Sequence, residues 1–175
     1  MSADSDRLDQ PPFPPLKWDD CDWWDGGIDL AFGESVGLTV TPYDPSVSRL
    51  PSSAQAAALE FQIGNGGRVM ESVLEAIRRY YDELRPRYLD FLGEEAGRLM
   101  PEIQGTWQLR DLIDLVQVHV HPWGLDGLAF VGLQFGCTWD REHGLGVQMH
   151  GDRVVEIGSA DASFAWSPDE AVERV

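Results

Sequence analysis

The hydrophobic residues of this 175-residue chain change their spacing twice, and this change constrains the fold more than any other feature. Between residues 28 and 41 they alternate with polar or small residues, as in a strand whose two faces differ. From 52 to 100 they recur at helical spacing, and from 116 to 157 the two-residue period returns. Strands, then helices, then strands predict an α+β domain with helices packed on one face of an antiparallel sheet.

The strands are predicted in two groups. The first is an N-terminal hairpin, with strands over 28–32 and 36–41 joined by the short link GES. The second is a C-terminal four-strand meander over about 116–121, 127–139, 145–149 and 154–157, with a tight turn at Gly151–Asp152. We expect the sheet face away from the helices to be partly solvated, with His119 and Gln148 on it or near it.

About three helices are predicted between the two groups, over 54–63, 67–85 and 88–100, with a short further turn from Thr106 to about Leu112 that Thr106 caps. A serine at 52 or 53 is a good N-cap for the first helix, and GNGG at 64–67 separates the first from the second. The second helix is expected to end at Arg85–Pro86, because the residue before a proline avoids the α region.

The length suits one domain, since a chain of this size buries roughly 70% of its extended surface on folding. A hydrophobic content of 43% excludes a disordered chain. We expect residues 1–15, which end in PPFPP, to be a flexible lead-in, residues 16–166 to form the domain, and residues 167–175 to be a charged tail.

The chain is strongly acidic, with a net charge of −17 and an isoelectric point near 4.3. Such a field repels nucleic acid and anionic membranes and favours a basic protein partner, although a salty cytoplasm also selects acidic surfaces. No secretory signal or membrane-spanning stretch is recognisable, and two cysteines make no disulfide framework. The expected location is the cytoplasm; the oligomeric state stays open.

The connection between the second and third strands of the meander carries Asp140, Glu142 and His143. As a hairpin turn, it would use the aspartate to bind backbone amides and Gly144 or Gly146 to supply a positive φ. As a functional site, it would use His143 as a base or ligand that Glu142 or Asp140 orients.

The sequence offers this turn no adjacent nucleophile. The nearest candidates, Cys137 and Thr138, lie in the strand before it. We therefore assign no catalytic residue, expect no cofactor, and favour a protein that is not an enzyme.

Histidines supply an alternative site. His119 and His121 are two residues apart on one strand and share a face, and His143 or His150 could approach from neighbouring strands. A metal site usually needs three or four ligands, so the metal alternative is the set His119, His121 and His143.

The segment KWDDCDWWDGG combines acidic and aromatic residues before the first predicted strand. It does not fit a calcium-binding loop, which needs ligands at fixed positions. Trp23 and Trp24 are adjacent and cannot both face inward on a regular strand, so an exposed aromatic–acidic patch and core packing are both open. The candidate binding residues are therefore Trp23, Trp24, Trp139, Asp140, Glu142 and His143.

The run GLAFVGLQFGCTWDREHGLGVQMHGDRVVEIGSADASF resembles the C-terminal part of an uncharacterised bacterial domain family with the signature F-x-C-T-W-D-x-E-H-G-L-G-V. The stretch SSAQAAALEFQIGNGGRVMESVLEAIRRYYDEL is similar to the helical region of that family, so the resemblance covers most of residues 16–166. Members look like small cytoplasmic proteins and resemble the immunity-type proteins that neutralise toxins. The resemblance implies a shared hairpin and no assigned reaction.

We therefore expect a cytoplasmic binding protein, such as an immunity-type inhibitor of a basic toxin nuclease. Two alternatives stay open: a metal-dependent enzyme or sensor that uses the histidine set, and a purely structural module.

Overall fold

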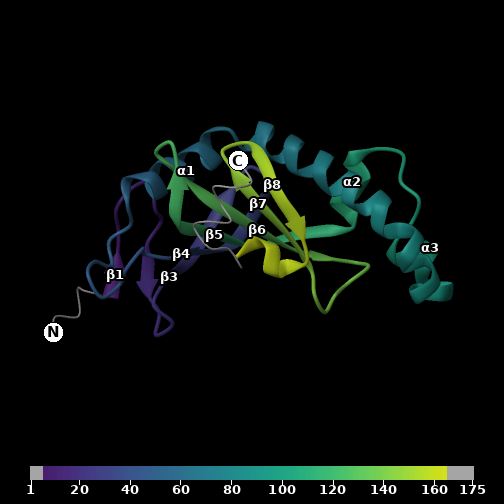
Figure 1. Ribbon diagram of the computed structural model, residues 1–175, viewed down its shortest axis with the longest axis horizontal. Coiled ribbons are helices and arrows are strands. Elements are labelled where there is room, and N and C mark those ends of the chain that lie inside the picture. Colours follow the sequence, from purple (N-terminus) through teal and green to yellow (C-terminus); the bar gives the residue numbers. More distant parts are fainter. Residues whose placement is uncertain (1–5, 165–175) are drawn as a thin grey trace.

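The computed structural model describes residues 6–164, and these form an eight-stranded sheet whose strands lie side by side in chain order (Figure 1). Every neighbouring pair is antiparallel except β4 and β5, which are parallel. The strands are β1 (Arg7–Leu8), β2 (Leu16–Trp18), β3 (Trp24–Leu30), β4 (Gly33–Val40), β5 (Ile113–Leu125), β6 (Leu128–Cys137), β7 (Leu145–His150) and β8 (Arg153–Gly158).

Helices lie between β4 and β5 in the sequence and cover one face of the sheet (Figure 1). Parallel neighbours need a long crossover, and the helical segment supplies it. The helices are α1 (Ser53–Gly64), α2 (Gly66–Leu92) and α3 (Ala96–Leu99), with single 3₁₀ turns at η2 (Gly93–Glu95), η3 (Thr106–Asp111) and η4 (Ala160–Ser163). The predicted α+β class is confirmed. Within residues 6–164, no helix combines the length and apolar character needed to cross a bilayer.

The strand layout differs from the predicted hairpin plus four-strand meander. β1 and β2 extend the sheet at one edge, and the parallel β4–β5 pair joins all strands into one sheet. Strands of two and three residues are too short to show a period, and periodicity does not reveal which distant strands pair. The link GES belongs to β4, so the hairpin turns earlier, at residues 31–32.

The lead-in predicted over residues 1–15 contains β1 and the buried side chains of Leu8 and Phe13. The tail predicted over residues 167–175 lies outside the described residues.

The helix-covered face of the sheet is apolar along its whole width. Val40, Val120, Val131 and Met149 are paired across β4 to β7 and are almost completely buried. They share one core with side chains of the two long helices, including Leu59, Val73 and Ile77. Burial of each such side chain stabilises the fold by roughly 1.5–3 kcal/mol, so this row fixes which face of each strand meets the helices.

The N-terminus of α1 matches its prediction. The Ser52 hydroxyl accepts a hydrogen bond from the Gln55 amide at 3.2 Å, and the Gln55 side-chain oxygen accepts one from the Ser52 amide at 2.9 Å. This reciprocal capping box satisfies two amides that a helix end leaves without partners. The GNGG turn also separates α1 from α2 as predicted, with Asn65 between them.

The predicted break at Arg85–Pro86 is wrong, because α2 continues to Leu92 with Pro86 inside it. Pro86 is exposed, so water can bind the carbonyl group that loses its amide donor. The helix predicted over 88–100 is instead the end of α2 followed by η2 and α3, since Gly93 adopts a positive φ of 54°. The turn at 106 is a 3₁₀ helix capped by Gly105, not by Thr106.

The face opposite the helices, here called the far face, is less solvated than expected. η4 lies against it, over β6 and β7, because Gly132 and Gly146 leave room for the backbone around Ser163. Gln148 is therefore completely buried, whereas His119 on the same face stays partly exposed.

Candidate functional site

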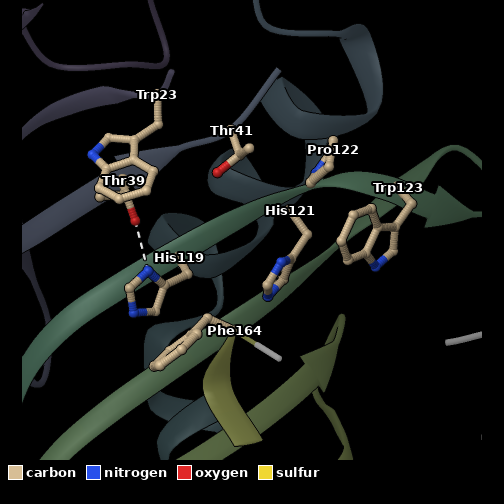
Figure 2. A pocket seen from close by; sticks show the side chains of 8 residues that line it. All are labelled: Trp23, Thr39, Thr41, His119, His121, Pro122, Trp123 and Phe164. Carbon is tan, nitrogen blue, oxygen red and sulfur yellow. Dashed lines mark hydrogen bonds between the residues drawn. The ribbon is translucent and has the colours of Figure 1, made fainter. Parts of the chain in front are cut away.

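A cavity of about 350 Å³ opens on the far face (Figure 2). Its walls come from segments that are far apart in the sequence: the β2–β3 loop, β4 and the residue after it, β5, and the residue that follows η4. Among the residues that the structure describes, no acidic, lysine or arginine side chain lines this cavity. The far-face pocket is lined by Trp23, Thr39, Thr41, His119, His121, Pro122, Trp123 and Phe164.

Strand alternation explains why these side chains meet. Thr39 lies opposite His119 in the parallel β4–β5 register, and their neighbours Val40 and Val120 point into the core. His121 is two residues beyond His119 and returns to the same face. The sequence pattern predicted this shared face for the two histidines, and the structure confirms it.

Both nitrogens of His119 have hydrogen-bond partners. Nδ1 lies 2.6 Å from the Thr39 hydroxyl and Nε2 lies 3.2 Å from the side-chain oxygen of Gln134. An amide oxygen only accepts, so Nε2 carries the proton and Nδ1 accepts from Thr39. Burial lowers the pKa of His119, which keeps its ring neutral at pH 7.

In the His121 ring, Nε2 has hydrogen-bond partners and Nδ1 has none among the described residues. Its Nε2 lies 3.0 Å from the backbone carbonyl of Ser163 and 3.2 Å from the side-chain oxygen of Gln148. A carbonyl can only accept, so Nε2 must be protonated and Nδ1 is a hydrogen-bond acceptor. Burial lowers the pKa of His121 to about 4. The ring stacks on Trp123, with 5.4 Å between centroids, and lies between Trp123 and His119 (Figure 2).

A second cavity, of about 360 Å³, lies between the end of α2 and the β6–β7 connection. It holds four of the predicted binding residues together, and α2 adds two aromatic side chains and one arginine. The α2–hairpin groove is lined by Arg87, Tyr88, Phe91, Trp139, Asp140, Glu142 and His143.

Asp140 organises this groove. Its Oδ1 accepts hydrogen bonds from the backbone amide and ring Nδ1 of His143, each at 3.0 Å, and its Oδ2 accepts one from the Tyr88 hydroxyl at 2.8 Å. Gly144 follows with a φ of 62°. The predicted turn, with an aspartate at its start and a glycine of positive φ, is confirmed. Its connection is longer than expected, because β6 ends at Cys137 and β7 begins at Leu145.

The same contacts set the protonation of the groove. Partial burial raises the pKa of Asp140, but the hydrogen bonds from His143 and Tyr88 together outweigh it and lower that pKa. The hydrogen bond to Asp140, and then its charge, raise the pKa of His143. Burial, followed by the Asp140 hydrogen bond, raises the pKa of Tyr88 to about 12. The tyrosine therefore stays protonated and donates.

The sequence pattern did not single out the three groove residues from α2, which are Arg87, Tyr88 and Phe91. The Phe91 side chain is 84% exposed and contacts Tyr88 edge to face, with 6.4 Å between ring centroids. No local pattern links this part of α2 to the β6–β7 connection. Trp139, by contrast, is buried and meets Tyr81 edge to face at 5.1 Å, so only its edge serves the groove.

The two tryptophans of the N-terminal segment separate as strand geometry requires. Trp24 is 2% exposed, contacts Trp18 edge to face, and donates from Nε1 to the carbonyl of Arg49. Its role is in the core. Trp23 points the other way and lines the far-face pocket.

The two candidate nucleophiles, the Cys137 thiol and the Thr138 hydroxyl, both donate hydrogen bonds to backbone carbonyls. Burial raises the pKa of the Cys137 thiol to about 11, and the thiol donates to the carbonyl of Asp140. The Thr138 hydroxyl donates to the carbonyl of Leu99 at 2.6 Å. Neither group is paired with the imidazole of His143, whose Nδ1 faces Asp140.

The alternative metal set does not assemble. His119 and His121 line the far-face pocket, whereas His143 lines the α2–hairpin groove. Among residues 6–164, no group of three or more histidine, cysteine, aspartate and glutamate side chains is arranged to hold a metal ion.

Fold and sites together define a mixed α+β domain with a cavity on its far face and a groove at the end of its longest described helix. Residues 13–164 match the model of a domain family described as a domain of unknown function, DUF6985, and the chain belongs to this family. No curated protein and no solved structure matches the chain.

Proposed function

We propose that this chain is a binding protein that captures a basic protein partner at the α2–hairpin groove. The observation that carries the proposal is the 84% exposure of Phe91 beside a cavity that also holds Tyr88 and Glu142. An exposed aromatic side chain next to a pocket is the usual form of an interface anchor, since a few aromatic residues carry most of the energy of association.

Charge supports a basic partner. The chain carries a net charge of −17. In the groove, the carboxylates of Asp140 and Glu142 lie with the guanidinium of Arg87 and the imidazole of His143, so the support for a basic partner is the charge of the whole chain. Opposite charges on two proteins speed their encounter and suppress association with acidic competitors. A carboxylate surface of this kind imitates the phosphates that a nuclease binds.

The more specific form of the proposal is an immunity-type inhibitor that neutralises a toxin nuclease in the bacterial cytoplasm. Its support is the acidity and the C-terminal signature, in which Asp140, Glu142, His143 and Gly144 build the turn at the edge of the groove. The constrained thiol of Cys137 and hydroxyl of Thr138 favour binding over catalysis.

The test compares three immobilised proteins: the wild type, Phe91→Ser and Glu142→Arg. Wild-type protein should capture a basic protein from a lysate of its own cells and release it near 0.5 M salt, where the screening length is below about 5 Å. Phe91→Ser and Glu142→Arg should each weaken this capture at least about tenfold, which corresponds to roughly 1.4 kcal/mol.

The matched control is Trp107→Ser, which also removes an exposed aromatic side chain, one that is 66% exposed and does not line the groove. It should capture the partner as well as the wild type does. Equal capture by all variants, or capture of an acidic protein that salt does not release, would contradict the proposal. For an inhibitor, one equivalent of this chain should also abolish the activity of the captured protein.

A further inference from the structure

We infer that the far-face pocket is a second binding site, for an uncharged, planar, largely apolar small molecule that donates a hydrogen bond. This inference is independent of the partner groove. The pocket lies on a different surface and shares no lining residue with the groove.

The walls of the pocket select against charge. Its aromatic side chains, Trp23, Trp123 and Phe164, surround two imidazoles that burial keeps neutral, and within residues 6–164 no acidic, lysine or arginine side chain lines it. A charged ligand would lose its hydration without gaining an opposite charge, and the aromatic faces would return only part of that cost to a cation. The net charge of −17 adds repulsion against anions.

Size restricts the ligand further. The volume of about 350 Å³ is near the lower end for small-molecule sites, which run from roughly 300 to 1,000 Å³. A ligand of one to three rings fits this space, and flat aromatic walls favour a planar ligand because stacked and edge-to-face ring contacts add to simple burial.

One polar atom of the pocket, Nδ1 of His121, calls for a ligand that donates a hydrogen bond. Nδ1 of His121 is an acceptor by the tautomer argument above, and no described residue donates a hydrogen bond to it. His119 offers nothing comparable, since both of its nitrogens already have partners. A ligand with an N–H or O–H group can therefore satisfy His121 Nδ1 from inside the pocket.

Close packing and hydrogen bonds also define the walls of the pocket, so it is not a gap left by loose packing. Glycines at 132 and 146 let η4 lie directly on the sheet, where the Ser163 carbonyl fixes the His121 tautomer. The next residue, Phe164, then meets His119 edge to face at 5.5 Å. Trp23, from the N-terminal part of the domain, and Phe164, from its C-terminal part, thus line the same cavity.

The test is calorimetric titration of the whole chain with four probes of nearly the same shape. Indole is neutral and donates through its N–H, whereas benzofuran has the same ring outline and no donor. Tryptamine and indole-3-acetate add a positive and a negative charge. We expect indole to bind saturably below about 1 mM and benzofuran to bind about tenfold more weakly, the factor that one hydrogen bond of roughly 1–1.5 kcal/mol supplies. Both charged probes should bind more weakly than indole.

Variants locate the site. Trp23→Ala removes one wall and Thr41→Trp fills the cavity, and each should weaken indole binding at least about tenfold. Ile63→Ser should not, because Ile63 is an exposed apolar residue of α1, on the other side of the sheet. Far-ultraviolet circular dichroism shows whether each variant is folded. If one pocket variant does not fold, the other still tests the site.

Three results would overturn the inference. They are absence of indole binding to the wild type at about 1 mM, equal affinity for indole and benzofuran, and tighter binding of either charged probe. None of these results bears on capture of a protein at the α2–hairpin groove, so the two proposals stand or fall separately.

Discussion

The surroundings of two histidines shift their pKa values in opposite directions. Burial lowers the pKa of His121 to about 4, whereas the hydrogen bond and charge of Asp140 raise the pKa of the exposed His143. His121 is therefore neutral at pH 7, and His143 binds its proton more tightly than an ordinary histidine does. Each shift predicts its own dependence on pH.

His121 should make the fold sensitive to mild acid. Its pKa is about 4 in the folded chain against 6.5 for an ordinary histidine, so the unfolded chain takes up its proton first. Its contribution to stability is complete above pH 6.5 and is lost as the pH falls towards 4, by up to about 3 kcal/mol. Urea unfolding at pH 7.5, 6 and 5 measures this loss.

The comparison protein for this prediction is His121→Gln, which keeps a donor for the Ser163 carbonyl and cannot titrate. It should lose less stability between pH 7.5 and 5 than the wild type does. His119, the titratable neighbour, has its pKa lowered in the same direction and is present in both proteins. Identical pH profiles for the two proteins would show that His121 titrates normally.

Asp140 should control the titration of His143. The pKa of His143 measured by NMR should lie above 6.5 in the wild type and fall towards 6.5 in Asp140→Asn. Glu142→Gln is the control and should lower it less, because Asp140 contributes more than Glu142 does. An unchanged value in Asp140→Asn would contradict the groove geometry.

The same pair also affects stability. Asp140 has a lowered pKa, so its contribution to stability is present above pH 3.8 and is lost as the pH falls through the lowered pKa. His143 has a raised pKa, so its contribution to stability is present below pH 6.5 and is lost as the pH rises through the raised pKa. The ion pair is therefore complete between about pH 4 and 6.5, as the two ordinary pKa values imply.

At the scale of elements, contact between η4 and the β6–β7 pair decides the shape of the far face. A methyl group on Gly132 would overlap the carbonyl oxygen of Ser163. Gly136, on the same strand, has open space at the corresponding position. The glycine at 132 thus permits the close approach that the pocket needs.

Gly132→Ala should destabilise the chain by about 2–4 kcal/mol, because the added methyl group forces η4 off the sheet. Gly136→Ala should change the stability by less than about 1 kcal/mol. Denaturant unfolding at pH 7.5 measures both, and equal effects would mean that η4 does not lie where the structure places it.

Sequence periodicity predicted the elements whose signal is local. The alternation around Val118 and Val120, the capping residue Ser52 and the turn at Gly151–Asp152 all identify strands, helices or turns from a few neighbours. Val116 does not join their buried face and is 42% exposed, because the register of β5 against β6 shifts at this residue. Periodicity missed β1 and β2, which are too short for a period, and it ended α2 too early, because an exposed turn tolerates Pro86.

The sites show the same limit. The turn at Asp140 follows from its own residues and was predicted, but the partners that make it a groove, Tyr88 and Phe91, come from a helix fifty residues earlier. The pocket needs Phe164 beside His119, which depends on how η4 crosses the sheet. No short sequence pattern reports either juxtaposition.

The cavity and the groove lie on separate surfaces of the molecule. Helices cover one face of the sheet (Figure 1). The far face holds the aromatic pocket, and the groove is lined by the end of α2 and the β6–β7 connection. A charge of −17 spread over such a small domain favours fast, salt-sensitive association with basic proteins. The central claim is that this association uses the groove.

Amide hydrogen exchange on the complex with the captured basic partner tests that claim most directly. We expect slower exchange at residues 87–92 and 139–144 when the partner is bound, with β1 and β2 unchanged, because only the first two segments line the groove or flank it. Unchanged exchange in those two segments, with protection elsewhere on the chain, would contradict it.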